Sequence, residues 1–142
     1  MRGRALAMAA MAAMLAPPAG AAAERVPCAV RLQFLPTAEG PAVAYLLTAQ
    51  VKNPTLRPAE AVSLLMFDAQ GTLVGNSDAG CGGAAGPLLG GDTGECGRVL
   101  QEVTAAMLGA FGAEVWTKIV NDQLERLQGI ASCEIVGFRF AE

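Results

Sequence analysis

Four cysteines and no histidine constrain this 142-residue chain more than any other feature of its sequence. Zinc sites built on cysteine usually need Cys-x-x-Cys pairs or histidine partners, and the chain has neither. An even number of cysteines in an exported chain instead predicts disulfides, here two of them. Whether the chain is exported is therefore the first question that its sequence has to answer.

The N-terminal residues have the pattern of a secretory signal peptide. Arg2 and Arg4 precede an uncharged apolar run over residues 5–16, and a small-residue cleavage pattern follows at residues 21–23. The run is too short for a mature membrane anchor, and no second long apolar stretch follows. We expect a signal peptide over residues 1–23, a single disulfide-bonded domain over residues 24–142, and a periplasmic or secreted protein.

The charge of the expected mature chain excludes several classes of partner. Its 119 residues carry eight basic and thirteen acidic side chains, and the basic residues are dispersed. Nucleic acids and anionic membrane surfaces require clustered positive charge. We therefore expect no nucleic acid and no membrane span, and a partner that is another exported protein or a component of the cell envelope.

Hydrophobic periodicity divides the chain into a strand-rich first half and a helical second half. Apolar and polar residues alternate where we expect strands, and apolar residues recur at helical spacing where we expect helices. The segment 80–97 contains eight glycines, and we expect it to form an irregular loop. The predicted strands are 28–35, 43–52, 61–68, 72–75 and 132–140, and the predicted helices are 96–109 and 114–128.

These elements favour an α+β fold. We expect an antiparallel sheet with two helices from the C-terminal half packed on one face, and a last strand that returns to the sheet. The alternative is an all-β immunoglobulin-like sandwich in which residues 98–104 form a strand.

Residues 45–76 resemble the FxLYD-type immunoglobulin-like domains of exported bacterial proteins. The matching points are Val51-x-Asn53 at a strand end, Phe67-Asp68 after an apolar strand, and residues 71–74 after a turn. The resemblance covers about a quarter of the chain and ends at residue 76. It implies an antiparallel β-sandwich that binds or spaces other molecules rather than catalysing a reaction.

Few residues are candidates for catalysis or metal binding. Without histidine, no Ser-His-Asp or Cys-His system can form. Asp92-Thr93-Gly94 is the tripeptide of aspartic proteases, which use two carboxylates around one shared proton. Asp78, Asp92 and Glu95 could offer oxygen ligands to calcium, although without the spacing of an EF-hand.

We therefore expect a small exported protein that binds or interacts structurally and is not an enzyme, with no cofactor. The alternatives are a hydrolase that uses paired carboxylates at Asp92, and a small-ligand or calcium-binding protein that uses the loop 80–97. Trp116 could anchor a partner, but its place on the apolar stripe of the second helix favours packing against the sheet. Asp68 is expected to be a turn residue.

The expected disulfides are Cys81–Cys96 and Cys28–Cys133. The first closes a short loop, which makes the encounter of its cysteines entropically easy, and the second then follows by exclusion. The second has a geometric difficulty, because both cysteines begin strands and antiparallel neighbours would put them at opposite ends. We expect either parallel terminal strands or a position for Cys28 beside a different element.

Overall fold

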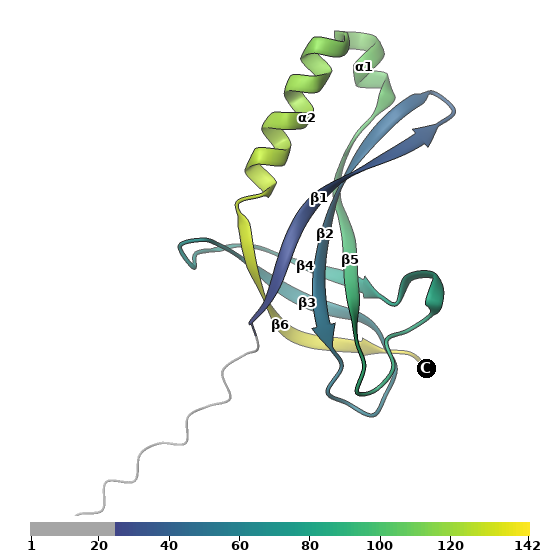
Figure 1. Ribbon diagram of the computed structural model, residues 1–142, viewed down its shortest axis with the longest axis vertical. Coiled ribbons are helices and arrows are strands. Elements are labelled where there is room, and N and C mark those ends of the chain that lie inside the picture. The colour runs from purple at the N-terminus through teal and green to yellow at the C-terminus, as the bar shows by residue number, and fades with distance from the viewer. Residues whose placement is uncertain (1–24) are drawn as a thin grey trace, which may run out of the picture.

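A computed structural model describes residues 25–142, and the predicted signal peptide lies outside these residues. The described chain is mostly antiparallel sheet with two helices in its C-terminal half (Figure 1). The strands are β1 Arg25–Thr37, β2 Gly40–Lys52, β3 Ala59–Asp68, β4 Leu73–Cys81, β5 Thr93–Val103 and β6 Ile130–Phe140. The helices are α1 Ala105–Phe111 and α2 Ala113–Leu127, and a single 3₁₀ turn covers Gly83–Ala85.

The six strands close into a barrel in the order β1-β2-β5-β4-β3-β6. Pairing is extensive within two groups of three strands, β1-β2-β5 and β6-β3-β4. The two groups meet at thin seams: β1 pairs with β6 through three residue pairs, and β4 pairs with β5 through two. The barrel therefore consists of two three-stranded sheets that are joined weakly along both edges.

A disulfide crosses each seam. Cys28–Cys133 joins β1 to β6, with Cα atoms 5.7 Å apart, and Cys81–Cys96 joins β4 to β5, with Cα atoms 4.1 Å apart. Both predicted pairings are confirmed. The expectation of parallel terminal strands, or of Cys28 beside a different element, is wrong, because β1 and β6 are antiparallel neighbours. The two strands are staggered and overlap only near their first residues, where Val26 lies opposite Cys133. This stagger brings the starts of both strands together and removes the geometric difficulty.

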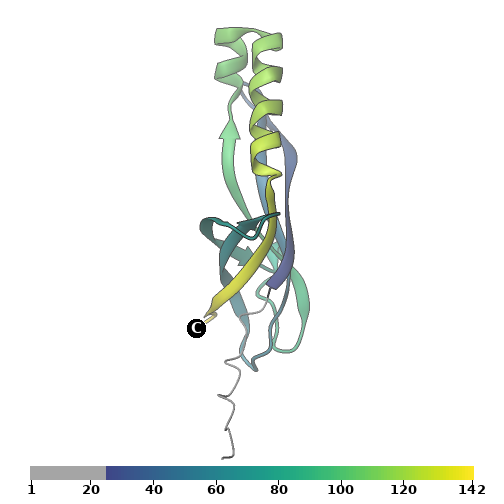
Figure 2. The ribbon, with the colours of Figure 1, turned by 90° about the vertical axis from the view of Figure 1, so that its left-hand side faces the viewer.

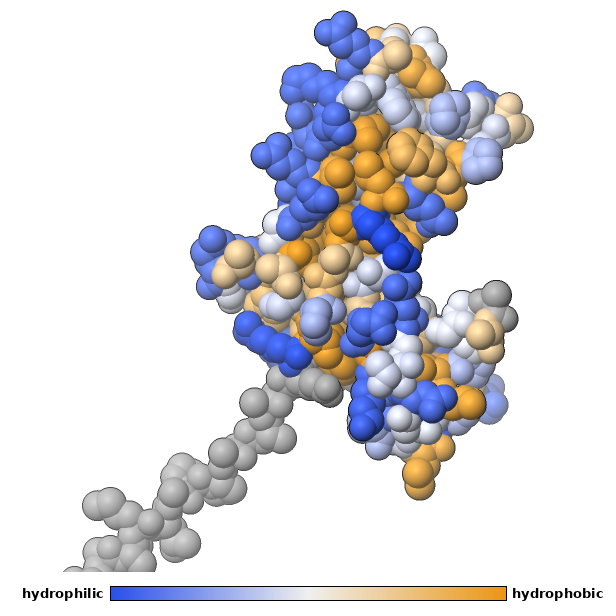
Figure 3. Space-filling model, viewed as in Figure 1, coloured by the Kyte–Doolittle hydropathy of each residue, from blue (hydrophilic) through white to orange (hydrophobic). Residues whose placement is uncertain are grey.

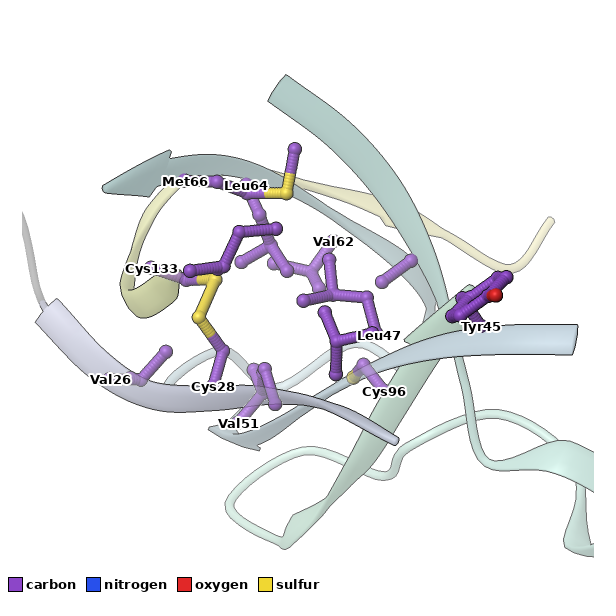
Figure 4. Packing of buried hydrophobic residues seen from close by; sticks show 14 of the residues in the cluster. Val26, Cys28, Tyr45, Leu47, Val51, Val62, Leu64, Met66, Cys96 and Cys133 are labelled. Carbon is purple, nitrogen blue, oxygen red and sulfur yellow. A yellow bond between two sulfur atoms is a disulfide. The ribbon is translucent and has the colours of Figure 1, made fainter. Parts of the chain in front are cut away.

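The core fills the barrel with side chains from both sheets. Leu47 and Val51 of β2 face Val62 and Leu64 of β3, and the Cys28–Cys133 disulfide lies beside them (Figure 4). Alternate residues of β2 are fully buried while those between them are more exposed toward its end, as expected for a strand with one inner face. The alternation in the sequence predicted this correctly.

The helices cover the part of the β1–β2 hairpin that extends beyond the barrel (Figures 1 and 2). Val120 of α2 is buried, and its backbone carbonyl accepts a 2.8 Å hydrogen bond from the hydroxyl of Tyr45 on β2. The predicted α+β composition and the returning last strand are confirmed, and the all-β sandwich is not needed. The sheet, however, is a closed barrel rather than an open sheet with helices across one face.

The predicted helix over residues 96–109 is wrong over most of its length. Residues up to Val103 belong to β5, and α1 is limited to Ala105–Phe111. A β-bulge lies where the partners of Tyr45 and Leu46 shift, and it adds one residue to β5. The bulge breaks the alternation of apolar residues there, so that the spacing of Val99, Leu100 and Val103 imitates that of a helix. The strand over 98–104 in the alternative fold was the better prediction here.

The glycine-rich segment 80–97 is also more regular than predicted, because both of its ends belong to strands. Gly97 faces β2 so closely that a Cβ atom would lie 3.2 Å from the backbone oxygen of Leu47. Gly82 and Gly86, in the connecting loop, have positive φ angles of 85° and 89°, which glycine adopts readily. Glycine therefore permits close strand packing in one part of the segment and tight turns in another.

Candidate functional site

The wall of the barrel opens between β4 and β5. These strands pair only at Gly80–Gly97 and Cys81–Cys96, and β5 then runs toward the helices while β4 turns across the barrel (Figure 1). Residues 73–79 of β4 and 98–103 of β5 consequently diverge without pairing, and residues of both strands line a hollow between them. We call the space between these two stretches the wall opening.

Both sides of the wall opening are strand edges with backbone groups that lack ladder partners. On the β4 side, the carbonyl of Asp78 points toward β5, since it accepts a 3.3 Å hydrogen bond from Nη1 of Arg98. Alternate residues of an antiparallel strand direct both backbone groups to the same side, so Asn76 also presents its N–H and C=O to the opening. An edge of this kind can pair with an additional extended chain.

Two neighbouring hollows lie along the wall opening, and Leu100 of β5 lines both of them. The first, which we call the polar hollow, has a volume of about 370 Å³. The residues that line it lie within a few positions of Cys81 in β4 and of Cys96 in β5. Its lining is mostly hydrophilic: Asn76, Ser77, Asp78, Arg98, Val99 and Leu100. The Asp78 carboxylate is already engaged, because it accepts a 2.6 Å hydrogen bond from Ser63 on β3.

The second hollow, which we call the apolar hollow, has a volume of about 350 Å³ and lies where β4 begins and α2 ends. Apart from one arginine, no lining side chain carries charge: Met66, Val74, Leu100, Arg126, Leu127, Gly129 and Ile130. Val74 is 51% exposed at its rim, and neighbouring Leu73 is 55% exposed. The volume and the lining suit a single large apolar side chain with one polar contact.

Arg126 lines the apolar hollow, and its guanidinium is held by Gln123. Its Nε and Nη2 donate hydrogen bonds of 3.1 and 2.5 Å to Oε1 of Gln123. Gln123 in turn donates a 2.5 Å hydrogen bond to Oε1 of Gln101 on β5. Among residues 25–142, Arg126 makes no ion pair, so its charge is oriented but not neutralised by a carboxylate.

The charge of Arg126 also reaches Tyr45 in the core. Burial raises the pKa of the Tyr45 hydroxyl above its usual value, and the positive charge of Arg126 partly opposes this shift. Tyr45 is the only tyrosine in the chain. Its ionisation therefore reports on the charge at the rim of the apolar hollow.

The carboxylates singled out in the sequence are not brought together. Asp92 is exposed in the turn before β5, whereas the aspartate of an aspartic protease is held at the end of an apolar strand. Glu95 accepts a 3.0 Å hydrogen bond from Arg31 on β1, and Asp78 is bound to Ser63. Within the described part of the chain, no three of its carboxylate or cysteine side chains form a group that could hold a metal ion.

Asp68 and Trp116 take the structural positions expected of them. Oδ1 of Asp68 accepts hydrogen bonds from the backbone N–H groups of Gln70 and Thr72, which makes it a turn residue. Trp116 packs against the core from α2 but remains partly exposed, and its buried Nε1 has no hydrogen-bond partner among residues 25–142.

A separate apolar surface lies at the helical end of the molecule. Apolar residues gather beside α2, over the upper part of the β1–β2 hairpin (Figure 3). Phe34 is 67% exposed and Phe111 is 59% exposed in this part of the fold. The two strands there are paired with each other, with Phe34 opposite Val43.

The described helices are all too short or too polar to cross a membrane. Comparison with models of protein families, with curated proteins and with solved structures yields no match for this chain. The candidate site therefore depends on geometry alone.

Sequence analysis missed both the wall opening and the role of Arg126. The wall opening forms because β4 and β5 diverge beyond the Cys81–Cys96 disulfide. It could not be predicted, because most of β5 was predicted to be a helix over residues 96–109. A signal was present at Arg126, because it is the one basic residue in the last turn of the strongest predicted helix. Its position over a hollow depends on how α2 leads into β6 at Gly129 (Figure 1), which the sequence did not define.

Proposed function

We propose that this protein is an exported binding protein without catalytic activity, and that it binds an extended segment of a partner polypeptide at the wall opening. One observation carries the proposal: two strand edges diverge unpaired, with an apolar hollow at the end of the opening. An extended chain supplies the alternating N–H and C=O groups that such an edge lacks, and its side chains supply the apolar contact. The partner would be another exported protein or an envelope component.

Export is supported by the signal-peptide pattern of residues 1–23 and is compatible with the two disulfides. We expect the exported protein to begin at Glu24. Intact-mass analysis of protein recovered from the periplasm or the medium measures this directly. A mass that still includes residues 1–23 would contradict export by this route.

Of β4 and β5, β4 has the edge that is better suited to pair with a partner chain. An added chain that runs antiparallel to β4 forms a more stable ladder than a parallel one, and it can reach the apolar hollow at the first residues of β4. Arg98 already occupies the carbonyl of Asp78 at the narrow end of the opening. Pairing is therefore expected from Asn76 toward Val74.

The test uses a library of random ten-residue peptides, from which the purified oxidised protein retains its ligands. We expect retained peptides to slow amide hydrogen exchange in residues 73–79, with Asn76 among the protected amides. The variant Val74→Glu places a charge at the rim of the apolar hollow and should weaken binding at least tenfold. Val136→Glu is the matched control, because Val136 is 55% exposed on β6, away from the wall opening. This variant should bind the peptides as the unchanged protein does.

Three outcomes would overturn the proposal. One is a library from which no peptide is retained. Another is protection that maps to the helical end around Phe111 instead of β4. The third is a dimer in sedimentation velocity that Val74→Glu dissociates, which would assign the wall opening to a second copy of this chain.

A further inference from the structure

We infer that the wall opening recognises the C-terminus of its partner polypeptide. The apolar hollow takes the last side chain, and Arg126 binds the terminal carboxylate. This inference rests on the proposed function and names the part of the partner that binds.

The chemistry of the apolar hollow is the first argument. Met66, Val74, Leu100, Leu127 and Ile130 line it without a charged group, and Arg126 is the one charged residue in its lining. A C-terminal residue with an apolar side chain is a single unit that carries both an apolar group and a carboxylate. An internal aspartate or glutamate would bring a carboxylate without the apolar group that fills the hollow.

The state of Arg126 is the second argument. Two of its N–H groups are held by Gln123, and its remaining N–H groups have no partner among the described residues. The Gln123–Gln101 hydrogen bond ties this arrangement to β5, so the guanidinium is oriented before a ligand arrives. An oriented guanidinium without a carboxylate is suited to binding one, since charge-assisted hydrogen bonds are among the strongest in proteins.

The third argument is the way in which the wall opening ends. Gly129 and Ile130, where α2 gives way to β6, form part of the lining of the apolar hollow. A chain that runs antiparallel to β4 arrives at the hollow with its C-terminal end leading. The junction of α2 and β6 is thus a wall of the hollow, so a chain that ends there fits better than one that continues.

The test compares forms of one peptide selected from the library described above. The peptide is prepared with a free carboxylate, as a C-terminal amide, and with two glycines added after its last residue. We expect the amide and the extended form to bind the unchanged protein about tenfold more weakly, because each lacks a carboxylate at Arg126.

The variant Arg126→Gln separates this contact from a general loss of affinity. It should bind the free-carboxylate peptide about tenfold more weakly and should no longer distinguish it from the amide. Lys118→Gln is the matched control, because it removes an exposed positive charge from the same helix outside the hollow, and it should preserve the discrimination. Melting temperatures of both variants confirm that each is folded.

Equal binding of the carboxylate and amide forms, with residues 73–79 still protected, would overturn this inference and leave the proposed function standing. Failure of every peptide to bind would overturn the proposed function and this inference with it. An undiminished preference for the carboxylate in Arg126→Gln would also overturn the assignment to Arg126.

Discussion

Asn53 shows how one buried polar side chain can join two loops. It is fully buried, and its Nδ2 donates to the backbone carbonyls of Arg57 and Leu88, at 2.7 and 3.1 Å. Its Oδ1 accepts from the N–H and the hydroxyl of Thr55. This side-chain amide therefore joins the loop after β2 to the loop before β5, in addition to the backbone hydrogen bonds that Asn53 makes with Gly91 and Asp92.

We predict that Asn53→Asp destabilises the protein by about 3–5 kcal/mol at neutral pH. A carboxylate would replace the NH₂ donor beside two carbonyl oxygens, and an unpaired buried charge is costly. Denaturant unfolding measures the change in free energy. The control is Asn121→Asp on the exposed side of α2, for which we expect a change within about 0.5 kcal/mol. Similar values for the two variants would contradict the bridging role of Asn53.

Tyr45 makes the stability of the fold sensitive to high pH. Because burial raises its pKa in the folded protein, the unfolded chain loses this proton first as the pH rises past about 10. Stability is therefore retained below that pH and is lost as the pH rises through the raised pKa. Tyr45→Phe should remove this part of the alkaline dependence, and should cost about 1 kcal/mol through loss of the hydrogen bond to Val120.

We predict that Arg126→Gln raises the pKa of Tyr45 further, because the charge of Arg126 is what lowers it. Phenolate absorbance during an alkaline titration follows this single tyrosine without interference from another. Lys118→Gln should leave the titration unchanged. An unaltered midpoint in Arg126→Gln would mean that the guanidinium does not act on the core.

At the scale of elements, the sequence predicted the regular strands well and β5 poorly. Alternation over 43–52 and 61–68 identified β2 and β3 to within a few residues, because each buries one face against the core. In β5 a bulge displaces the alternation, and glycines replace side chains where strands approach closely. Both features depend on the partner strand, so periodicity within β5 alone could not reveal them.

Gly97 provides a test of this close approach. We predict that Gly97→Ala costs about 1–3 kcal/mol, because its Cβ would lie 3.2 Å from the backbone oxygen of Leu47 and would push β2 and β5 apart. Gly137→Ala on β6 is the control, since no atom lies within 4 Å of the Cβ position there. Thermal and denaturant unfolding compare the two, and an equal cost would contradict the steric explanation.

At the scale of the whole molecule, two disulfides hold two sheets together. The Cys28–Cys133 bridge spans 105 residues of sequence and the Cys81–Cys96 bridge spans 15. The pairing was predictable from the short separation of one pair, and the stagger that permits the other was not. Barrel closure was not predictable either, because it depends on seams of only three and two residue pairs.

We predict that the two bridges contribute unequally to stability. On the chain-entropy model, the double substitution of Cys28 and Cys133 by alanine should cost about 4–5 kcal/mol, and that of Cys81 and Cys96 about 3 kcal/mol. Guanidinium unfolding of the two double variants, each with its remaining bridge intact, measures the difference. A larger cost for the shorter bridge would show that native contacts at the β4–β5 seam outweigh chain entropy.

The two seams also set how many strand edges are free to pair with other chains. With both disulfides reduced, the sheet β1-β2-β5 is held to the sheet β6-β3-β4 only by ladders of three and two residue pairs, so the two sheets can separate and free the edges of their outer strands. Free strand edges pair readily with other chains, so a reduced chain is open to polymerisation from several sides at once. Oxidation keeps both seams joined, so that only the strand residues beyond each seam have a free edge, and Arg98 already covers one carbonyl of β4. The same cross-links that stabilise the monomer thus limit the number of directions in which it can self-associate.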